Sequence, residues 1–495
     1  MRDLSQSSPL LRSPDAFYSA AQSIPLDAIV QQRDGLPKLA STLRDGSSEP
    51  LRVCFLGGSV TEQRSGYRPR VTQWLTAQAQ QKRVRVEEVP AFCGNCGSKV
   101  LAFMVADWVI SRKPHLVFIE LCINDGDTLL ETDDEVSLGS ALEGIIRHVR
   151  DALPNCELCL LYMFLRDDLP LHQRTGSKAW ADNEAPNAVQ TYHARIPSLH
   201  NRVAAHYGVP SISLIPLMSA MPIQLRQAIF RDDCHMHDPG AAFAASAICA
   251  ALQAVIIKGD SGRSDHAIAK LPPPLHARPW GRGRREEVQP KHLSFFYGHS
   301  PTMSIPEQQA LQQQLVQQHT QVDMDPLDNM QRKAWWLLYP GKDRAEFAFK
   351  GTRLGILTMI GPDSGYLVCE IDGGKWRQRI NLCDKWSYFW RLAVVSLVED
   401  ELPKGEHVAV LYLEAEVPDR SVWNKQPSGP FWQQVKAEGK EHKLWLMHWL
   451  VEEESEKERA VVRREATAQA AAPPQQPGAR LGGAGLATGG RRADP

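Results

Sequence analysis

Between residues 48 and 258 the chain alternates between short apolar runs and amphipathic stretches, and this alternation constrains the fold more than any other feature. The runs LRVCFLGG, HLVFIELC and CELCLLYMFL have the length of buried strands, and stretches with helical periodicity separate them. Strands that are joined by helices and buried on both faces form parallel sheets. We therefore predict a three-layer α/β/α domain over residues 48–258, with helices on both faces of a parallel sheet.

The composition changes beyond this domain. Residues 259–330 contain PPP, GRGRREE and a Gln-rich stretch, which predict a linker that is partly disordered. Residues 331–450 contain short alternating runs between Gly, Pro and Asp turns, and the pair Asp372–Gly373 is typical of a β-hairpin. This pattern predicts a C-terminal antiparallel β-sandwich domain. Nine of the 13 tryptophans fall in it, and we expect packing for most of them, with stacking on sugar rings as the alternative.

The two ends of the chain differ from the predicted domains. Residues 1–47 form a polar N-terminal extension with one short helix ending at Gly46, and residues 451–495 predict a charged helix and a disordered tail. The N-terminus has no apolar segment of a secretory signal, and no apolar run approaches the ~20 residues that span a bilayer. We therefore expect a cytoplasmic protein without a membrane span.

Net charge and cysteine content bear on whether the protein binds nucleic acid, forms disulfides or holds a metal. The net charge of −1 gives no reason to expect nucleic acid. Most of the ten cysteines lie in apolar patterns, which favours reduced, buried thiols over a disulfide scaffold. A zinc site would require the pairs Cys93/Cys96 and Cys156/Cys159 to converge, and the second pair lies in a strand pattern whose positions face opposite ways. We expect no metal site and no cofactor.

Four short blocks carry the chemistry. GGS ends at Ser59 between a strand pattern and a helix pattern, and FCGNCGS, ELCINDGD and RDDCHMHDPG follow in that order. The two glycines let the backbone turn tightly and leave the Ser59 side chain exposed at the carboxyl edge of the sheet. Taken alone, GGS is more typical of an ordinary tight strand-to-helix loop than of a nucleophile.

The other blocks supply a base, its partner and hydrogen-bond donors. His235 is the candidate base, and Asp232, three residues earlier, can hold its imidazole in the required tautomer. Two neighbours, Asp233 and His237, compete for these roles, and HMHD lacks the third ligand of a metal site. The side-chain amide of Asn124 and the backbone amides of Gly94 and Ser59 would form an oxyanion hole. Read singly, Asn124 is a turn residue and Asp125 a structural cap.

In this order the blocks resemble those of the SGNH (GDSL-like) hydrolase superfamily. The resemblance implies a flavodoxin-like α/β/α domain, the catalytic residues Ser59, Asp232 and His235, and an oxyanion hole of Ser59, Gly94 and Asn124. The chain departs from the family pattern at several positions. Gly58 replaces the usual Asp before the serine, and Cys93 and Cys96 stand where Ser and Thr are common. Cys122 replaces a Gly, and Met236 replaces a Pro.

The segments GLPKLASTL and GGSVTEQRSGYRPRVTQWL also resemble a subgroup of carbohydrate esterases with an appended β-domain. This resemblance implies a serine esterase that hydrolyses O-acyl esters, with acetyl esters of carbohydrates as the expected substrates and no cofactor. Two alternatives remain open: an O-acyltransferase on the same site, and a non-catalytic carbohydrate-binding or scaffolding protein. The expected partner is a small acyl ester or an acylated carbohydrate, and the oligomeric state stays open.

Overall fold

A computed structural model describes most of the chain between residues 24 and 453. Within that span it leaves out residues 95, 133, 166–185, 233, 261–270, 278, 290–292, 296–335, 342, 385–386, 389–390, 399–401 and 423–441. The described residues belong to one compact unit, within residues 1–453. The predicted Gln-rich linker and nearly all of the predicted C-terminal helix and tail lie outside the described residues.

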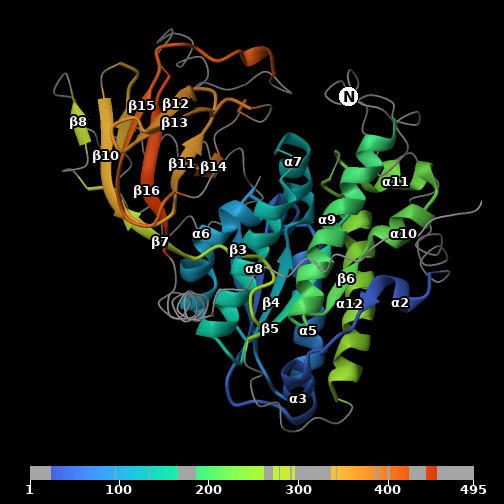
Figure 1. Ribbon diagram of the computed structural model, residues 1–495. Coiled ribbons are helices and arrows are strands. Elements are labelled where there is room, and N and C mark those ends of the chain that lie inside the picture. The colour runs from blue at the N-terminus through green and yellow to red at the C-terminus, as the bar shows by residue number, and fades with distance from the viewer. Residues whose placement is uncertain are drawn as a thin grey trace, which may run out of the picture. The chain divides into compact units, whose positions relative to one another are not determined.

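A six-stranded sheet forms the centre of the first part of the chain (Figure 1). Its order is β1-β6-β5-β4-β2-β3, with the bounds β1 (Val30–Gln31), β2 (Leu51–Gly57), β3 (Val86–Phe92), β4 (Leu116–Glu120), β5 (Glu157–Tyr162) and β6 (Ser211–Ser213). Strands β2 to β6 are parallel, which confirms the predicted sheet. Strand β1, from the predicted N-terminal extension, joins β6 antiparallel at the edge. The five parallel strands have the flavodoxin-like order, with the switch point between β2 and β4.

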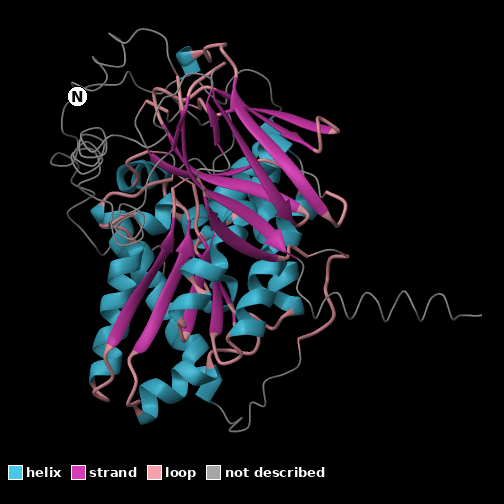
Figure 2. Ribbon diagram, turned by 90° about the vertical axis from the view of Figure 1, so that its left-hand side faces the viewer, coloured by secondary structure: helices cyan, strands magenta, loops and turns pink. Residues whose placement is uncertain are grey.

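Two groups of helices make the outer layers (Figure 2). One group consists of α3 (Pro37–Asp45), α5 (Tyr67–Gln80) and α12 (Asp238–Asp260), and the other of α6 (Ser98–Trp108), α7 (Cys122–Thr132), α8 (Glu135–Ala152) and α9 (Pro186–His206). The short helices are α2 (Leu26–Ile29), α4 (Ser59–Glu62), α10 (Ile215–Ala220) and α11 (Ile223–Ile229). Helix α3 ends as predicted at Gly46, where a φ of 87° favours glycine.

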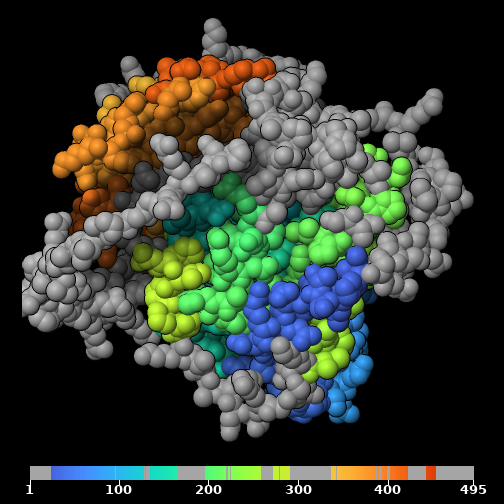
Figure 3. All heavy atoms as spheres, turned by 45° about the vertical axis from the view of Figure 1, so that its right-hand side comes forward, coloured from blue at the N-terminus to red at the C-terminus, as the bar shows by residue number. Residues whose placement is uncertain are grey.

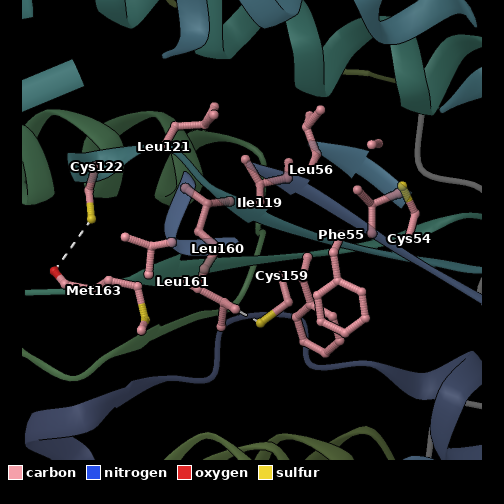
Figure 4. Close-up of a cluster of buried hydrophobic side chains, with 14 of the residues drawn as sticks. Cys54, Phe55, Leu56, Ile119, Leu121, Cys122, Cys159, Leu160, Leu161 and Met163 are labelled. Carbon is pink, nitrogen blue, oxygen red and sulfur yellow. Dashed lines mark hydrogen bonds between the residues drawn. The ribbon is translucent and has the colours of Figure 1, made fainter. Parts of the chain in front are cut away.

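The central strands are apolar because both faces are covered (Figure 4). All five residues of β4 are buried. The rings of Phe55 and Phe118 stack across β2 and β4 with their centroids 5.1 Å apart. All ten cysteines are free thiols and nine of them are buried, as predicted. Buried thiols act here as small apolar side chains.

Helix α12 corrects one statement drawn from the sequence. Residues 238–257 are long and apolar enough to cross a membrane by length and composition, with a mean hydropathy of 2.0. In the structure 61% of this stretch is buried, and α12 packs against α3, α5 and α11. One such helix is also what the core of a water-soluble protein contains, because an Ala-rich core helix is apolar all round.

The second part of the chain consists of two antiparallel sheets that share a core, as predicted. Their orders are β13-β12-β15-β10-β8 and β14-β11-β16-β7, with β9 also paired to β16. The bounds are β7 (Arg282–Glu287), β8 (Leu293–Phe295), β9 (Trp336–Leu338), β10 (Asp343–Lys350), β11 (Arg353–Ile360), β12 (Tyr366–Ile371), β13 (Trp376–Asn381), β14 (Arg391–Ser396), β15 (Glu406–Leu413) and β16 (Leu444–Glu453).

The core of this sandwich uses the tryptophans for packing. The rings of Phe347 and Trp449 stack between the sheets with centroids 4.7 Å apart. Trp445 and Trp449 are fully buried, and Trp336 is nearly so. Trp335, Trp386, Trp390, Trp423 and Trp432 lie outside the described residues.

Strand β7 was expected to be linker, and it instead joins the two parts of the chain. It pairs with β16 and packs against α6. A Cβ on Gly283 would lie 2.4 Å from Phe103 Cα, so the strand approaches the helix as closely as backbone allows. Arg285 Nε bonds Asp107 Oδ2 at 2.8 Å. Arg284 and Glu287 are exposed and Arg285 pairs with Asp107, so charged side chains hide the strand pattern.

The segment that precedes β7 is fastened to α8 and α9 (Figure 3). The buried Glu143 carboxylate accepts the backbone amides of Leu275 and His276, at 2.6 and 2.8 Å. His206 Nε2 lies 2.7 Å from the carbonyl oxygen of Pro273. These contacts fix the course of the chain between the two parts.

Candidate functional site

Three of the predicted site residues meet at the carboxyl ends of neighbouring strands. Ser59 follows β2, Gly94 follows β3 and Asn124 follows β4. Because β2 lies between β3 and β4, the three positions surround the switch point of the sheet. In open α/β sheets this is where ligands bind.

The turn before Ser59 has no room for side chains. A Cβ on Gly57 would lie 2.3 Å from Thr61 Oγ1, and a Cβ on Gly58 would lie 1.8 Å from Asn124 Oδ1. Glycine at position 58, where the SGNH pattern has aspartate, therefore fits this site because Asn124 occupies the space. Ser59 is partly exposed and is the first residue of α4. Its backbone amide is among those that a helix leaves without an internal partner.

Asn124 lies in the first turn of α7 and is 8% exposed. Its neighbour Asp125 is fully buried and accepts the backbone amide of Ser98 on Oδ1, at 2.6 Å. Asp125 Oδ2 lies 2.9 Å from Nε2 of the buried His200. Asp125 thus fastens the start of α6, and with it the loop that carries Gly94, beside Asn124. This contact agrees with the interpretation of Asp125 as a structural cap, because its carboxylate accepts the amide of the first residue of α6.

Gly94 lies next to Ser59, and a third residue meets them both. A Cβ on Gly94 would lie 3.8 Å from Ser59 Cβ and 3.1 Å from Glu62 Oε2. Burial raises the pKa of Glu62 to about 7, while a hydrogen bond from the Gly94 backbone amide and the charge of Arg68 oppose the rise. Glu62 was not among the residues predicted for the site. Its spacing from Ser59, one helical turn, is the signal that could have found it.

Asp232 and His235 form the predicted pair. His235 Nδ1 lies 2.9 Å from Asp232 Oδ1 and 3.0 Å from Oδ2, and the backbone amides of His235 and Cys234 also donate to Oδ1. Burial alone would raise the pKa of Asp232, but the hydrogen bond and charge of His235 outweigh it and hold that pKa far below its usual range. The ionised carboxylate leaves Nδ1 as the proton donor and Nε2 free to act as a base.

The loop of His235 is tied to the helix of Ser59. Gln63, which caps α4, donates from Nε2 to the carbonyl oxygen of Met236 at 2.7 Å, and both groups are buried. Among the described residues, no hydrogen bond joins Ser59 to His235. Such catalytic hydrogen bonds are often long without substrate and tighten in its complex.

The same loop contains a group of metal-ligand type. Asp232, Cys234 and His235 place one ligand atom each within 4.8 Å of one another. Cys234 Sγ is 3.4 Å from His235 Nδ1. That nitrogen and the carboxylate already face each other at hydrogen-bond distance, so a cation there would replace the proton that orients the imidazole. His237 is exposed, and Asp233 lies outside the described residues.

Comparison with known families decides the class of this domain. Residues 55–243 match the GDSL-like lipase/acylhydrolase family. These residues form a GDSL-like lipase/acylhydrolase domain. The match confirms the predicted SGNH resemblance for this domain.

Solved structures extend the likeness beyond the GDSL-like domain. A two-domain esterase active on acetylated mannans, co-crystallised with mannopentaose, has a TM-score of 0.58 and 16% identity, and the match covers 86% of this chain and 99% of that one. A second structure of such an esterase has the same TM-score at 15% identity, with the same shares covered. At these identities the likeness concerns the fold, including the appended β-domain. No curated protein matches the chain.

The GDSL-like domain also contains a buried polar network, near Ser59 in the chain, that was not predicted. Thr61 Oγ1 lies 2.8 Å from the Tyr67 hydroxyl and donates to Glu120 Oε2 at 3.0 Å, with all three residues buried. Arg68 Nε donates to the Thr61 carbonyl oxygen at 2.9 Å. The network joins β4 and α5 to α4, the helix that begins at Ser59. The motif GYRP supplies two of its members.

Proposed function

We propose that this protein is a serine esterase that hydrolyses O-acyl esters, with acetyl esters of carbohydrates as its substrates. The convergence of Ser59, Gly94 and Asn124 at one sheet edge, beside a loop that holds an ionised Asp232 against His235, carries the proposal. These are the parts that acyl transfer requires: a nucleophile, an oriented base and donors for an oxyanion.

The roles follow from the geometry. His235 Nε2 takes the Ser59 proton as Ser59 Oγ attacks the acyl carbon. The imidazolium that forms is stabilised by Asp232, and it then protonates the leaving alcohol. The backbone amides of Ser59 and Gly94 and the side-chain amide of Asn124 donate to the oxyanion. Water, activated by the same imidazole, hydrolyses the acyl-enzyme and regenerates Ser59.

The substrate class rests on two supports. The family match covers the α/β domain, and its members hydrolyse acyl esters. The solved esterase with the same two-part fold acts on acetylated mannans. We therefore place an acetylated polysaccharide or oligosaccharide first among candidate substrates.

The test compares wild-type protein with Ser59→Ala on p-nitrophenyl acetate, butyrate and octanoate, and on acetylated mannan and xylan oligosaccharides. We expect wild-type activity that favours acetyl, and a loss of at least about 1000-fold in kcat for the variant. Ser47→Ala, an exposed serine away from the site, is the matched control and should retain activity. A fluorophosphonate should label wild type and not Ser59→Ala.

Each alternative has its own outcome. Acyl transfer to an added sugar at a higher rate than hydrolysis would identify an O-acyltransferase on the same residues. Absence of both reactivity and fluorophosphonate labelling would contradict the proposal and leave a carbohydrate-binding or scaffolding protein.

A further inference from the structure

Glu62 is an acidic side chain at the point where the proposed reaction develops negative charge. It lies one helical turn after Ser59, on α4. A Cβ on Gly94 would be 3.1 Å from Glu62 Oε2 and 3.8 Å from Ser59 Cβ, so the carboxylate, the glycine and the serine meet in one place. A carboxylate next to a developing oxyanion opposes the reaction, because like charges repel in a partly buried site.

Glu62 and the oxyanion compete for the same hydrogen-bond donor, the backbone amide of Gly94. The Gly94 backbone amide hydrogen-bonds the Glu62 carboxylate. An amide has one proton to donate. The same proton cannot serve the carboxylate and the oxyanion at once, so the side chain must release Gly94 before the oxyanion forms.

Arg68 does not neutralise Glu62 completely. It is buried, and its guanidinium pairs with Glu88 on β3, stacks on Phe92 and donates to the Thr61 carbonyl oxygen. Those bonds engage the Arg68 guanidinium, and its charge opposes the rise in the pKa of Glu62 without cancelling it.

Resting on the proposed esterase function, we propose that Glu62 is a specificity-determining gate on the oxyanion hole, which holds the Gly94 amide when ionised, releases it when protonated, and restricts the enzyme to uncharged acyl groups. The ionised gate disfavours both the oxyanion and a carboxylate carried by the acyl chain. A neutral acetyl group meets neither penalty once the gate is protonated.

Protonation of the gate falls in the physiological range. The pKa of Glu62 is raised to about 7 by burial. The charged groups around it are Arg68 from α5, Glu88 from β3, Glu120 from β4 beneath Thr61, and Asp232 with His235 in the loop tied to Gln63. Only Arg68 among these lowers the pKa of Glu62 through its charge. The competent, protonated form is thus the main form below pH 7 and is lost above it.

The experiment measures kcat/KM against pH, from 6 to 9, for wild type and Glu62→Gln with p-nitrophenyl acetate. Glutamine keeps the shape and removes the charge. We expect equal values within about threefold at pH 6, and more than about tenfold higher kcat/KM for Glu62→Gln at pH 8.5, because about 3% of a group with pKa 7 is protonated there. Glu87→Gln, the same change at an exposed site on β3, is the control and should follow wild type.

A second substrate tests specificity. The substrate is the half-ester p-nitrophenyl succinate, and the quantity measured is the ratio of its kcat/KM to that of p-nitrophenyl acetate. Glu62→Gln should raise this succinate-to-acetate ratio by about tenfold, and Glu87→Gln should leave it unchanged. If Glu62→Gln does not fold, as judged by circular dichroism, Glu62→Ala replaces it with the same expectations.

The outcomes separate this inference from the function on which it rests. An active wild type whose pH profile and succinate-to-acetate ratio are unchanged by Glu62→Gln overturns the gate and leaves the esterase intact. A wild type that is inactive on every ester and is not labelled by a fluorophosphonate overturns both.

Discussion

Asp232 is held ionised by more contacts than an ordinary surface carboxylate receives. Three donors meet its Oδ1, namely Nδ1 of His235 and the backbone amides of His235 and Cys234. If these contacts exist to orient the imidazole, Asp232→Asn should leave the fold intact and present the wrong tautomer to Ser59. We expect kcat to fall by about 10³–10⁴-fold, with KM little changed. Steady-state kinetics on an acetyl ester measures this.

Asp45→Asn is the matched control, because Asp45 is exposed and pairs only with its neighbour Arg44 among the described residues. Activity of Asp232→Asn within tenfold of wild type would contradict the assigned role. The residue would then be a fold determinant of the loop.

At the residue scale the sequence could place Ser59, Gly94 and Asn124 at one edge, because strand ends of a parallel sheet converge. It could not place Glu62 there. Whether a side chain three positions after a serine faces the next loop depends on how α4 meets β3, and that contact is set by residues far apart in the chain. The roles of these residues stay predictions until the variants are measured.

Strand β4 ends in a buried acid, and this affects stability. Glu120 is 1% exposed, and burial raises its pKa to about 7, with the charge of Asp125 adding to the rise and the Thr61 hydroxyl opposing it. An unfolded glutamate loses its proton near pH 4.3. The folded protein therefore binds an extra proton between these values, so stability is full below about pH 4 and falls as the pH rises to about 7.

Glu120→Gln should remove this dependence. We expect the free energy of unfolding of wild type to fall by up to about 1.4 kcal/mol per pH unit from this group between pH 5 and 7, and that of Glu120→Gln to fall less. Urea unfolding at several pH values measures it. Glu87→Gln should keep the wild-type slope, and equal slopes for all three proteins would refute a protonated Glu120.

Helices and strands could be predicted from the sequence where a local pattern of residues determines them. The hairpin of β12 and β13 turns at Asp372 and Gly373, with φ of 54° and 70°, as its Asp-Gly pair predicts. Strand β7 could not be predicted from the sequence because most of its residues are arginine or glutamate. Its partners lie on α6 and β16. Periodicity in apolar residues cannot reveal a strand whose neighbours supply the apolar surface.

At the scale of the molecule, the β-rich part is a continuation of the α/β core. Leu357, Met359 and Trp445 belong to the same buried cluster as Phe103 of α6. Gly283→Ala tests how tightly the parts fit, since its Cβ would lie 2.4 Å from both Cα and the carbonyl oxygen of Phe103. Backbone atoms cannot move aside cheaply, so we expect a loss of about 1–3 kcal/mol in the free energy of unfolding.

Gly405→Ala is the control, because a Cβ there meets no atom within 4 Å. Its free energy of unfolding should change by less than about 0.5 kcal/mol. Equal stability of the two variants would mean that β7 and α6 adjust freely.

The pairing of β7 with a distant strand has a consequence for folding during synthesis. Its hydrogen-bonding partner, β16, spans Leu444–Glu453 and is the last strand of the described chain. A ribosome adds about 5–20 residues per second, so roughly 10–30 s pass between the synthesis of β7 and that of its partner. During that interval the apolar face of α6 has no completed sheet to cover it. We expect a chaperone that binds exposed apolar helices to bind the nascent chain during this interval. Translation pauses between β7 and β16 would lengthen the interval.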